Sequence, residues 1–434
     1  MFLTLILVFI VGYAAIALEH PLMINKSASA LFLAVLMWIL LMAGGSTLLP
    51  HIPHPQLFLK DELLRHLGEI AEILFFLVGA MTIVELIDSH EGFRIITDRI
   101  TTRNKVKLLW ILGFITFFMS AVLDNLTATI VMVALLSKLM ADKKDRWFFA
   151  GMIIIAANSG GAFSPIGDVT TIMLWIGGQV TALNIIQKTF LPSLISMIIP
   201  LSVLSFFLRG EVHRPALHGL SGGINLTTSK ERNLVLFMGI GFLLFVPVFK
   251  SLTQLPPWVG MMFGLSILWI TTEMMHKSRN DEHKSGLTVA GILRRIDTPT
   301  ILFFLGILTA VAALQSAGHL EAMARSLDRS IGNLYVINGI IGLLSAVIDN
   351  VPLVAGAIGM YQTAFPTDHY FWEMLAYCAG TGGSILIIGS AAGVAVMGME
   401  KIDFIWYMKR ISLWALTGYL AGAFAYWGMQ VFFG

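Results

Sequence analysis

Ten stretches of this chain are apolar for roughly the length that crosses a lipid bilayer, and this limits the possible folds more than any other feature. A helix needs about 20 apolar residues to span the hydrocarbon core, and backbone hydrogen bonds can be satisfied there only within helices or closed barrels. We therefore predict an all-α polytopic membrane protein. The predicted spans are residues 2–18, 28–49, 69–88, 147–178, 184–208, 233–250, 258–275, 299–316, 372–399 and 404–432.

The composition excludes most other classes of protein. Of 434 residues, 57% are hydrophobic and 12% are charged, with a mean hydropathy of +0.82. A soluble domain of this length carries more surface charge, and a net charge of +2 gives no reason to expect nucleic acid as a partner. The single cysteine, Cys378, excludes an intramolecular disulfide. Because the sequence has neither a P-loop nor the spacing of a His–Cys metal site, we expect neither an enzyme nor a resident cofactor.

Two further apolar runs are too long for one span and too short for two. Residues 108–137 contain Asp124 as their only charge, and residues 331–365 contain only Asp349. Lysine and arginine flank the first run on both sides, and basic loops stay in the cytoplasm. The first run is therefore predicted to be a re-entrant helical hairpin that enters from the cytoplasm and turns near Asp124. The second is expected to enter from outside, because residues 366–373 carry no lysine or arginine.

The hairpins belong to an internal repeat. Three segments recur in the same order, namely "ILFFL" at 73–77 and 301–305, "SAVLDN" at 120–125 and "SAVIDN" at 345–350, and "SGGAFSPIGD" at 159–168 and "TGGSILIIGS" at 381–390. The offsets of 228, 225 and 222 are too similar to be accidental. Five predicted spans separate the first segment from its mate, and an odd number implies opposite orientations. Inverted repeats are the plan of secondary transporters, which bind their substrates at the repeat interface near the membrane midplane.

The orientation of the predicted spans and the internal repeat together divide the chain into domains. An extra N-terminal span occupies residues 1–27, and the first repeat occupies 28–208. A linker with a connecting span follows at 209–255, and the second repeat occupies 256–434. The basic loops within 209–232 and 276–298 are expected inside, so ten spans and two hairpins leave both termini outside.

One predicted span in each repeat is interrupted by glycine. Residues 147–178 hold three glycines and a proline between 160 and 167, and residues 372–399 hold four glycines between 380 and 389. Glycine-dense segments unwind helices, and a broken helix frees carbonyl oxygens in its first half and amide groups in its second. Such oxygens suit a hard cation such as sodium, and the second half favours an aspartate or an anion. Each repeat is thus predicted to place a hairpin tip against a broken helix.

Three aspartates lie in the apolar core of the repeats, where a charge costs at least about 2.5–3.5 kcal/mol. Asp124 and Asp349 lie at the hairpin tips, and Asp168 ends the first glycine-rich break. Each is expected to bind a cation or a proton, while helix capping is the simpler alternative. The mate of Asp168 is Ser390, so the first repeat holds two acids and the second holds one. We therefore predict the sodium site at Asp124, Asn125 and Asp168.

Neutral oxygens from the same segments are expected to complete the cation- and proton-binding set, although serine and threonine in membrane helices often bond their own backbone. The further candidates are Asn125, Thr127, Asn158, Ser159, Ser164, Asn350 and Thr381. Glu72 is expected to pair across helices. Five histidines, among them His66 and His90, are expected in loops or at the membrane interface, with pH sensing as the alternative.

Four stretches carry a resemblance to a known family. They are "LDNLTATIVM" at 123–132, "NSGGAFSPIGDVTT" at 158–171, "IDNVPLVAG" at 348–356 and "GTGGSILIIGSAAGVAVMGME" at 380–400. They resemble the signature stretches of NhaD-type sodium/proton antiporters, members of the ion transporter superfamily that also includes sodium-coupled dicarboxylate transporters. The resemblance covers roughly residues 70–400. It implies a scaffold domain, a transport domain built from hairpins and broken helices, a homodimer and an elevator-like movement.

The hairpin tips differ from those of the dicarboxylate branch. That branch carries Ser-Asn-Thr at each tip, whereas the tips here read Asp124-Asn125-Leu126 and Asp349-Asn350-Val351. The difference favours a cation as substrate over an anion.

The expected protein is a multi-pass antiporter of the cell inner (plasma) membrane, surrounded by lipid. It is predicted to exchange cytoplasmic Na⁺, and Li⁺ as well, for external H⁺. Because burial disfavours the charged form of a carboxylate, a proton and a cation are expected to compete for it. The alternative is a sodium-coupled symporter of a dicarboxylate or a similar anion, with sodium at the same residues. A passive channel would not need two mirrored sets of unwound helices.

Overall fold

The computed structural model describes residues 2–97, 100–208, 210–212, 227–277 and 286–433. These residues form helices and, apart from an isolated β-bridge between Asn104 and Glu211, no strand pairing. The predicted all-α fold is confirmed for them. Parts of the two basic loops that were used to orient the chain, at 213–226 and 278–285, lie outside the described residues.

Seven helices among the described residues are long and apolar enough to cross a membrane. They are α3 (Lys26–Leu48), α4 (Pro55–Ser89), α6 (Lys105–Leu123), α10 (Ala182–Phe207), α11 (Ser229–Thr253), α12 (Pro257–Met275) and α15 (Thr298–Ser316). The other larger helices are α1 (Phe2–Ala17), α7 (Asn125–Leu139), α8 (Lys143–Ala162), α9 (Val169–Ile176), α17 (Leu334–Leu344), α18 (Asn350–Tyr361), α19 (Tyr370–Gly382), α20 (Ala391–Glu400) and α22 (Ser412–Phe433). Connecting helices are α2 (Glu19–Leu22), α5 (Arg94–Thr97), α14 (Val289–Ile292), α16 (His319–Ser330) and α21 (Phe404–Arg410).

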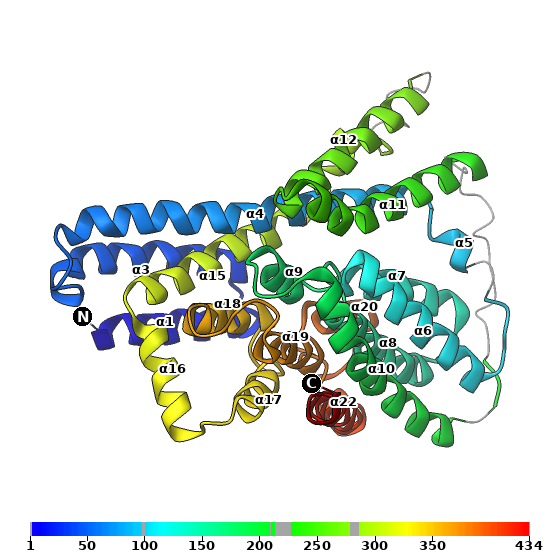
Figure 1. The fold of residues 1–434 in the computed structure, drawn as a ribbon. Helices are drawn as coiled ribbons and strands as arrows, with labels where there is room; N and C mark the ends of the chain where they lie inside the picture. Colours follow the sequence, from blue (N-terminus) through cyan, green and yellow to red (C-terminus); the bar gives the residue numbers. More distant parts are fainter. Residues whose placement is uncertain (1, 98–99, 209, 213–226, 278–285, 434) are drawn as a thin grey trace.

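Six helices, α1, α3, α4, α11, α12 and α15, form one side of the molecule and are called the scaffold group (Figure 1). Within it α3 packs along α15, and α4 packs against both α15 and α12. The indole Nε1 of Trp38 in α3 donates to the carbonyl oxygen of Thr309 in α15 at 2.9 Å. The helices α4 and α15, which carry the two copies of "ILFFL", are therefore neighbours in this group.

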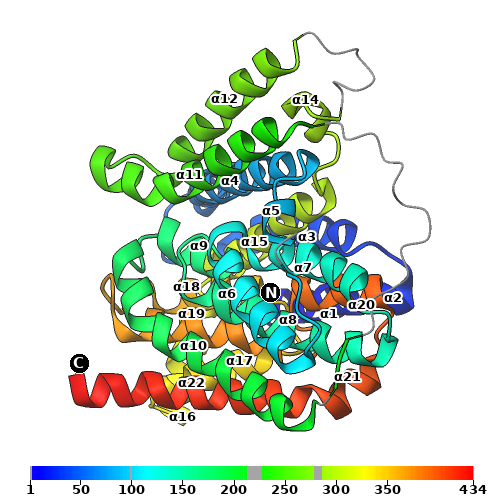
Figure 2. The same ribbon diagram turned by 90° about the vertical axis from the view of Figure 1, so that its right-hand side faces the viewer.

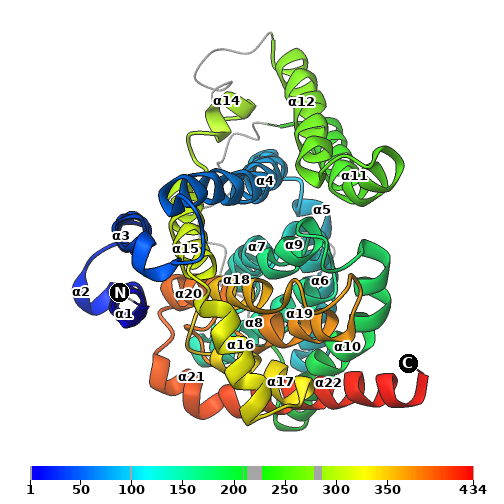
Figure 3. The same ribbon diagram turned by 60° about the vertical axis from the view of Figure 1, so that its left-hand side comes forward.

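The remaining large helices form the core group, which contains the hairpins, the broken helices, α10 and α22 (Figure 2). The first hairpin and α8 pack together, as do α17 and α19, and α10 packs along α22. Figure 3 shows α4, α11 and α12 above α9, α18 and α19. The fold thus separates the candidate site segments from the helices that surround them.

The first hairpin turns at a single residue. Helices α6 and α7 meet at Asp124, whose φ of 101° reverses the chain direction. Lys105, at the start of α6, forms an ion pair of 2.5 Å with Asp145, at the start of α8. Because only three residues join α7 to α8, both ends of the hairpin lie at one end of the core group. The predicted hairpin geometry is present, and its entry from the cytoplasm stays a prediction.

The second hairpin repeats these contacts. Ser120 in α6 donates from Oγ to the carbonyl oxygen of Ala157 in α8 at 2.6 Å. Ser345, directly after α17, donates from Oγ to the carbonyl oxygen of Ala379 in α19 at 2.9 Å. The two bonds are related by the offsets of the sequence repeat, 225 for the hairpins and 222 for the broken helices. The repeat in the sequence is therefore a repeat in three dimensions.

Glycine allows each broken helix to touch its hairpin. A Cβ atom on Gly160 would collide with the carbonyl oxygen of Phe117 in α6, and one on Gly382 would collide with that of Gly342 in α17. A larger residue at Gly160 or Gly382 would push hairpin and broken helix apart.

The two broken helices run in opposite directions. The start of α8 meets the end of α20, where Arg146 forms an ion pair of 3.0 Å with Glu400. The other end of α9 meets the start of α19, where the backbone amide of Thr181 donates to Asp368 Oδ1 at 2.6 Å. This antiparallel arrangement agrees with inverted repeats. The boundaries proposed for the repeats, 28–208 and 256–434, stay predictions.

Some elements differ from those expected. Helix α4 is 35 residues long, whereas only 69–88 was predicted. Arg65 forms ion pairs with Glu62 and Glu69 one turn away on either side, and such pairs stabilise a helix beyond its apolar run. The expected span 404–432 is divided at Ile411 into α21 and α22. The amphipathic helix α16, between two apolar runs, was not predicted.

Candidate ion-binding site

Asp168 is the carboxylate around which the site is built. It follows the break after α8 and caps the N-terminus of α9, where its Oδ1 accepts from the Thr170 amide at 2.8 Å and from Thr170 Oγ1 at 2.6 Å. Only 1% of its surface is exposed. Capping and a binding role are thus compatible at this residue, because Oδ2 is not used by the cap.

Both hairpin tips reach Asp168. Asn125 at the first tip donates from Nδ2 to Asp168 Oδ2 at 2.5 Å. Asn350 at the second tip donates from Nδ2 to Asp168 Oδ1 at 3.5 Å. Both asparagines are buried. Two residues that are equivalent in the repeat therefore converge on one carboxylate that has no equivalent.

Asn158 joins this cluster to the second broken helix. Its Oδ1 accepts from Asn125 Nδ2 at 3.1 Å. Its Nδ2 donates to Ser384 Oγ at 2.9 Å and to Ser390 Oγ at 3.0 Å. The side chain of Asn158 is fully buried in α8. Both breaks and both tips thus meet in one hydrogen-bonded network.

Two members of the network, Ser384 and Ser390, were not among the predicted site residues. Both come from the second break and accept from Asn158. Ser390 had a usable signal, because it aligns with Asp168 in the repeat. Ser384 aligns with Ala162 and had no such signal.

Asp124 and Asp349 cap the second helix of their own hairpins. Asp124 accepts from the amide and the Oγ1 of Thr127, both at 2.8 Å. Asp349 accepts from the amide of Val351 at 3.2 Å. Neither is hydrogen-bonded to the network, although their charges interact with that of Asp168. A direct role of Asp124, Thr127 or Asp349 in ion binding stays a prediction.

Three further predicted residues contact other parts of the core group. Ser164 donates from Oγ to the carbonyl oxygen of Ala121 at 2.5 Å and so ties the first break to the first hairpin. Ser159 shares a hydrogen bond of 2.7 Å with Ser196 in α10, and Thr381 donates to Tyr377 within α19. Of the predicted sodium ligands, the structure brings Asn125 and Asp168 together and directs Asp124 to its own helix.

The network can present either donors or acceptors to the carboxylate. In this structure the amide NH₂ groups of Asn125 and Asn350 face Asp168. A half-turn of either side-chain amide presents Oδ1 instead, and carboxylate, amide and hydroxyl oxygens are ligands for hard cations. Among the described residues there is no group of three or more His, Cys, Asp or Glu side chains that could hold a metal ion. A carboxylate-poor site of this kind suits reversible binding of a monovalent cation.

Comparisons with known proteins identify the family of this chain. A family profile described as "Citrate transporter" matches residues 13–380. "Sodium/proton antiporter 2" of Arabidopsis thaliana is 45% identical, over 98% of this chain and 99% of that protein. "Na(+)/H(+) antiporter NhaD" of Alkalimonas amylolytica is 32% identical, over 96% of this chain and 88% of that protein. The chain belongs to the family of NhaD-type sodium/proton antiporters.

A solved structure supports the fold of this NhaD-type protein. The YdaH transporter of Alcanivorax borkumensis aligns with a TM-score of 0.59 at 12% sequence identity, over 94% of this chain and 98% of that one. Family and fold together make the chain a multi-span membrane transporter.

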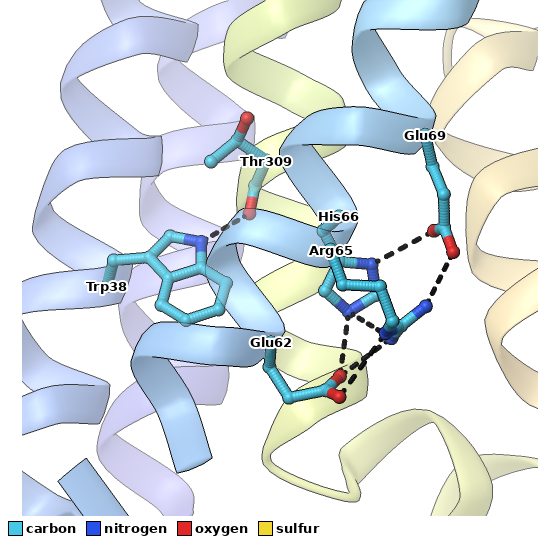
Figure 4. Close-up of polar contacts among 6 residues, drawn as sticks. All are labelled: Trp38, Glu62, Arg65, His66, Glu69 and Thr309. Atoms are coloured by element: carbon cyan, nitrogen blue, oxygen red, sulfur yellow. Dashed lines mark hydrogen bonds and ion pairs between the residues drawn. The ribbon is translucent and has the colours of Figure 1, made fainter. Parts of the chain in front are cut away.

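Two histidines of this NhaD-type chain, expected in loops or at the membrane interface, are buried. His66 is buried in α4 between Glu62 and Glu69, with nitrogen–oxygen distances of 3.5 and 3.4 Å (Figure 4). His90, at the end of α4, lies 2.9 Å from His276, which follows α12. The His66 ring is buried because α4 extends further at its N-terminal end than predicted. The His90 ring is buried because the other end of α4 packs against α12. The expectation of a loop is wrong for His66, which lies inside α4, whereas His90 lies in the turn after α4 as expected. A position at the membrane interface stays a prediction for both.

Proposed function

We propose that this transporter exchanges cytoplasmic sodium for external protons at Asp168. The observation that carries the proposal is the convergence of Asn125, Asn350 and Asn158 on or beside this one buried carboxylate. Monovalent cations and protons are the substrates that such a site distinguishes best, because a carboxylate binds either one. The names of the relatives, sodium/proton antiporters from a plant and from bacteria, support the same substrates.

Sodium and proton transport are coupled because the two ions compete for the carboxylate of Asp168. Transfer of an ionised carboxylate away from water is unfavourable, so Asp168 is occupied by a proton or compensated by a cation. A cation that approaches from the cytoplasm displaces the proton and is released on the other side, where a proton replaces it. Exchange results because the unoccupied carboxylate is the least stable form.

Alternating access is proposed to move the core group as one body against the scaffold group. The hydrogen bonds at Asp168 and Asn158 join both hairpin tips to both breaks, so these four segments are expected to move together. The inverted arrangement gives two related conformations that open to opposite sides.

The test is transport by the purified protein in liposomes that contain a pH-sensitive dye. Addition of sodium or lithium is expected to move protons, whereas potassium is expected to move few. Asp168→Asn is expected to abolish the signal. Succinate uptake that depends on sodium, without proton movement, would instead identify a dicarboxylate symporter and refute the proposal.

Three finer properties complete the proposal. Lithium is expected to replace sodium because the site offers only oxygen ligands for a small cation. The membrane is proposed to be the cell inner (plasma) membrane, which fractionation of cells that express the tagged chain checks. A homodimer is proposed from the family resemblance, and the mass of the detergent-solubilised protein after subtraction of bound detergent checks it.

A further inference from the structure

A polar cavity lies between the scaffold group and the core group. Helices α4 and α15 line it from the scaffold group, and α9 and α18 line it from the core group. Its volume is about 300 Å³, which is room for several water molecules. The cavity therefore sits at the interface that alternating access must open and close.

Six polar side chains from all four sides converge on this cavity. They are His66, Glu69, Glu72, Gln179, Gln315 and Gln362. A polar cavity of this size at a helix interface inside a membrane protein is unfavourable unless water or ions use it. The lining distinguishes this cavity from the apolar grooves beside α1 and α6, which carry almost no polar surface.

Two residues that line the cavity lie close to the ion-binding network. Met173 in α9 is five residues beyond Asp168, and Ala355 in α18 is five residues beyond Asn350. At a rise of 1.5 Å per residue, each is about 7.5 Å from the site residue that begins its helix. Both copies of the repeat thus contribute one helix that leads from the cavity to Asp168.

The cavity reaches the end of the core group that faces outside in the predicted orientation. It is lined by Gly177 and Gln179 after α9, and the amide of Asp368 donates to the carbonyl oxygen of Gln179 at 2.8 Å. This is the end of the core group opposite the Arg146–Glu400 ion pair, where the basic segments lie.

Charge at the rim favours cations. Glu69 is paired with Arg65 at 2.6 Å (Figure 4). Glu72 interacts with the charge of Lys250 through space. The Nζ of Lys250 donates instead to the carbonyl oxygen of Trp175, at 2.9 Å. When Glu72 is ionised, less of its negative charge is compensated by a direct ion pair than is the case for Glu69.

We propose that this cavity is the outer approach to the Asp168 site, through which sodium leaves and protons enter, and that Glu72 attracts monovalent cations into it. The inference deepens the proposed sodium/proton exchange and rests on it. A carboxylate in a narrow space with low-dielectric walls raises the local concentration of cations and lowers that of anions. Glu72 is a guiding residue that acts before the ion reaches Asp168.

Cysteine labelling tests the route without any measurement of transport. In a Cys378→Ser background, Ala355→Cys is compared with Ala357→Cys, two residues along α18. Ala355 lines the cavity, whereas Ala357 is fully buried on another face of the helix. A membrane-impermeant, positively charged thiosulfonate added outside is expected to label Ala355→Cys and not Ala357→Cys. Ile358→Cys, on the cavity face, replaces Ala355→Cys if that variant does not fold.

A second comparison tests the role of Glu72. The labelling rate at Ala355→Cys with a cationic reagent is divided by the rate with an anionic reagent of similar size. The ratio is expected to exceed one and to fall about threefold in Glu72→Gln, because the loss of one nearby charge in a hydrated space lowers the local concentration of the cationic reagent and raises that of the anionic one. Glu321→Gln, which removes an exposed charge on α16, serves as the matched control and leaves the ratio unchanged.

The outcomes are separable. Labelling of Ala355→Cys only from the cytoplasmic side, or equal labelling of Ala355→Cys and Ala357→Cys, would overturn the route. A ratio that Glu72→Gln does not change would overturn the role of Glu72. If labelling follows the expectation but the protein moves no sodium and no protons in liposomes, the exchange proposal fails while the outer approach stands.

Discussion

At the scale of residues, the two copies of the repeat contribute equivalent asparagines to the site, but only one copy contributes a carboxylate next to them. Asn125 and Asn350 are equivalent in the repeat, and both donate to the same carboxylate. Asp168 is that carboxylate, and Ser390 replaces it in the other copy. A symmetric arrangement of tips and breaks therefore surrounds a carboxylate that only one copy of the repeat supplies.

Asp168→Asn is expected to abolish sodium-dependent proton movement while the protein still folds. Asparagine can cap α9 as aspartate does, but it cannot hold a proton or a net charge. Asp124→Asn is compared with it, because asparagine also preserves the cap at Thr127. The predicted role of Asp124 in ion binding requires that this variant lose exchange as well. Normal exchange in either purified variant would remove that residue from the ion-binding set.

At the scale of elements, the pattern of apolar runs and repeats was sufficient to predict hairpins, breaks and their pairing. It was not sufficient to predict which of two adjacent polar residues does which task. At the first tip Asp124 caps α7, and Asn125 reaches Asp168. If the helix began one residue later, Asn125 would be the cap and Asp124 would be free. Sequence patterns do not place a helix start to within one residue. The N-terminal half of α4 was missed for a different reason, since ion pairs rather than apolar residues stabilise it.

Close contact between hairpin and broken helix gives a prediction for α17. In Gly342→Ala the new Cβ would lie about 2.6 Å from the carbonyl oxygen of Cys378, and such overpacking costs about 1–3 kcal/mol. Gly339→Ala, one turn earlier, meets open space and is expected to be neutral or to stabilise by up to about 1 kcal/mol. Thermal unfolding of both variants in detergent measures the difference. Equal stability would show that the hairpin does not pack against α19 this closely.

At the scale of the whole molecule, opposite orientation of the repeats places the two hairpin entrances on opposite faces. The ion pairs Lys105–Asp145 and Arg146–Glu400 gather the basic segments at one end of the core group. The contact between Thr181 and Asp368 marks the other end. Alternating access then requires only that the scaffold group cover one end at a time.

Labelling from the two sides of the membrane tests this orientation. In the Cys378→Ser background, cysteines at the exposed positions Lys107 and Lys144 are expected to react only from the cytoplasm. A cysteine at Thr363, which follows α18, is expected to react only from outside. Reaction of Lys107→Cys and Lys144→Cys from opposite sides would mean that residues 108–137 cross the membrane, and the orientation of everything beyond them would reverse.

The exchange cycle as a whole predicts a specific dependence on pH. If sodium and a proton share Asp168, sodium can bind only to the deprotonated form. Its apparent affinity should then weaken about tenfold for each unit of pH below the pKa of the site, and it should level off above that pKa. The maximum velocity at saturating sodium should change much less over the same range, because sodium displaces the proton.

Two measurements between about pH 6 and 9 test this dependence. Calorimetry gives the affinity for sodium, and exchange kinetics give the maximum velocity. A constant affinity with a changing velocity would place the pH dependence in a separate titrating group, with the buried pair His90 and His276 as the first to test.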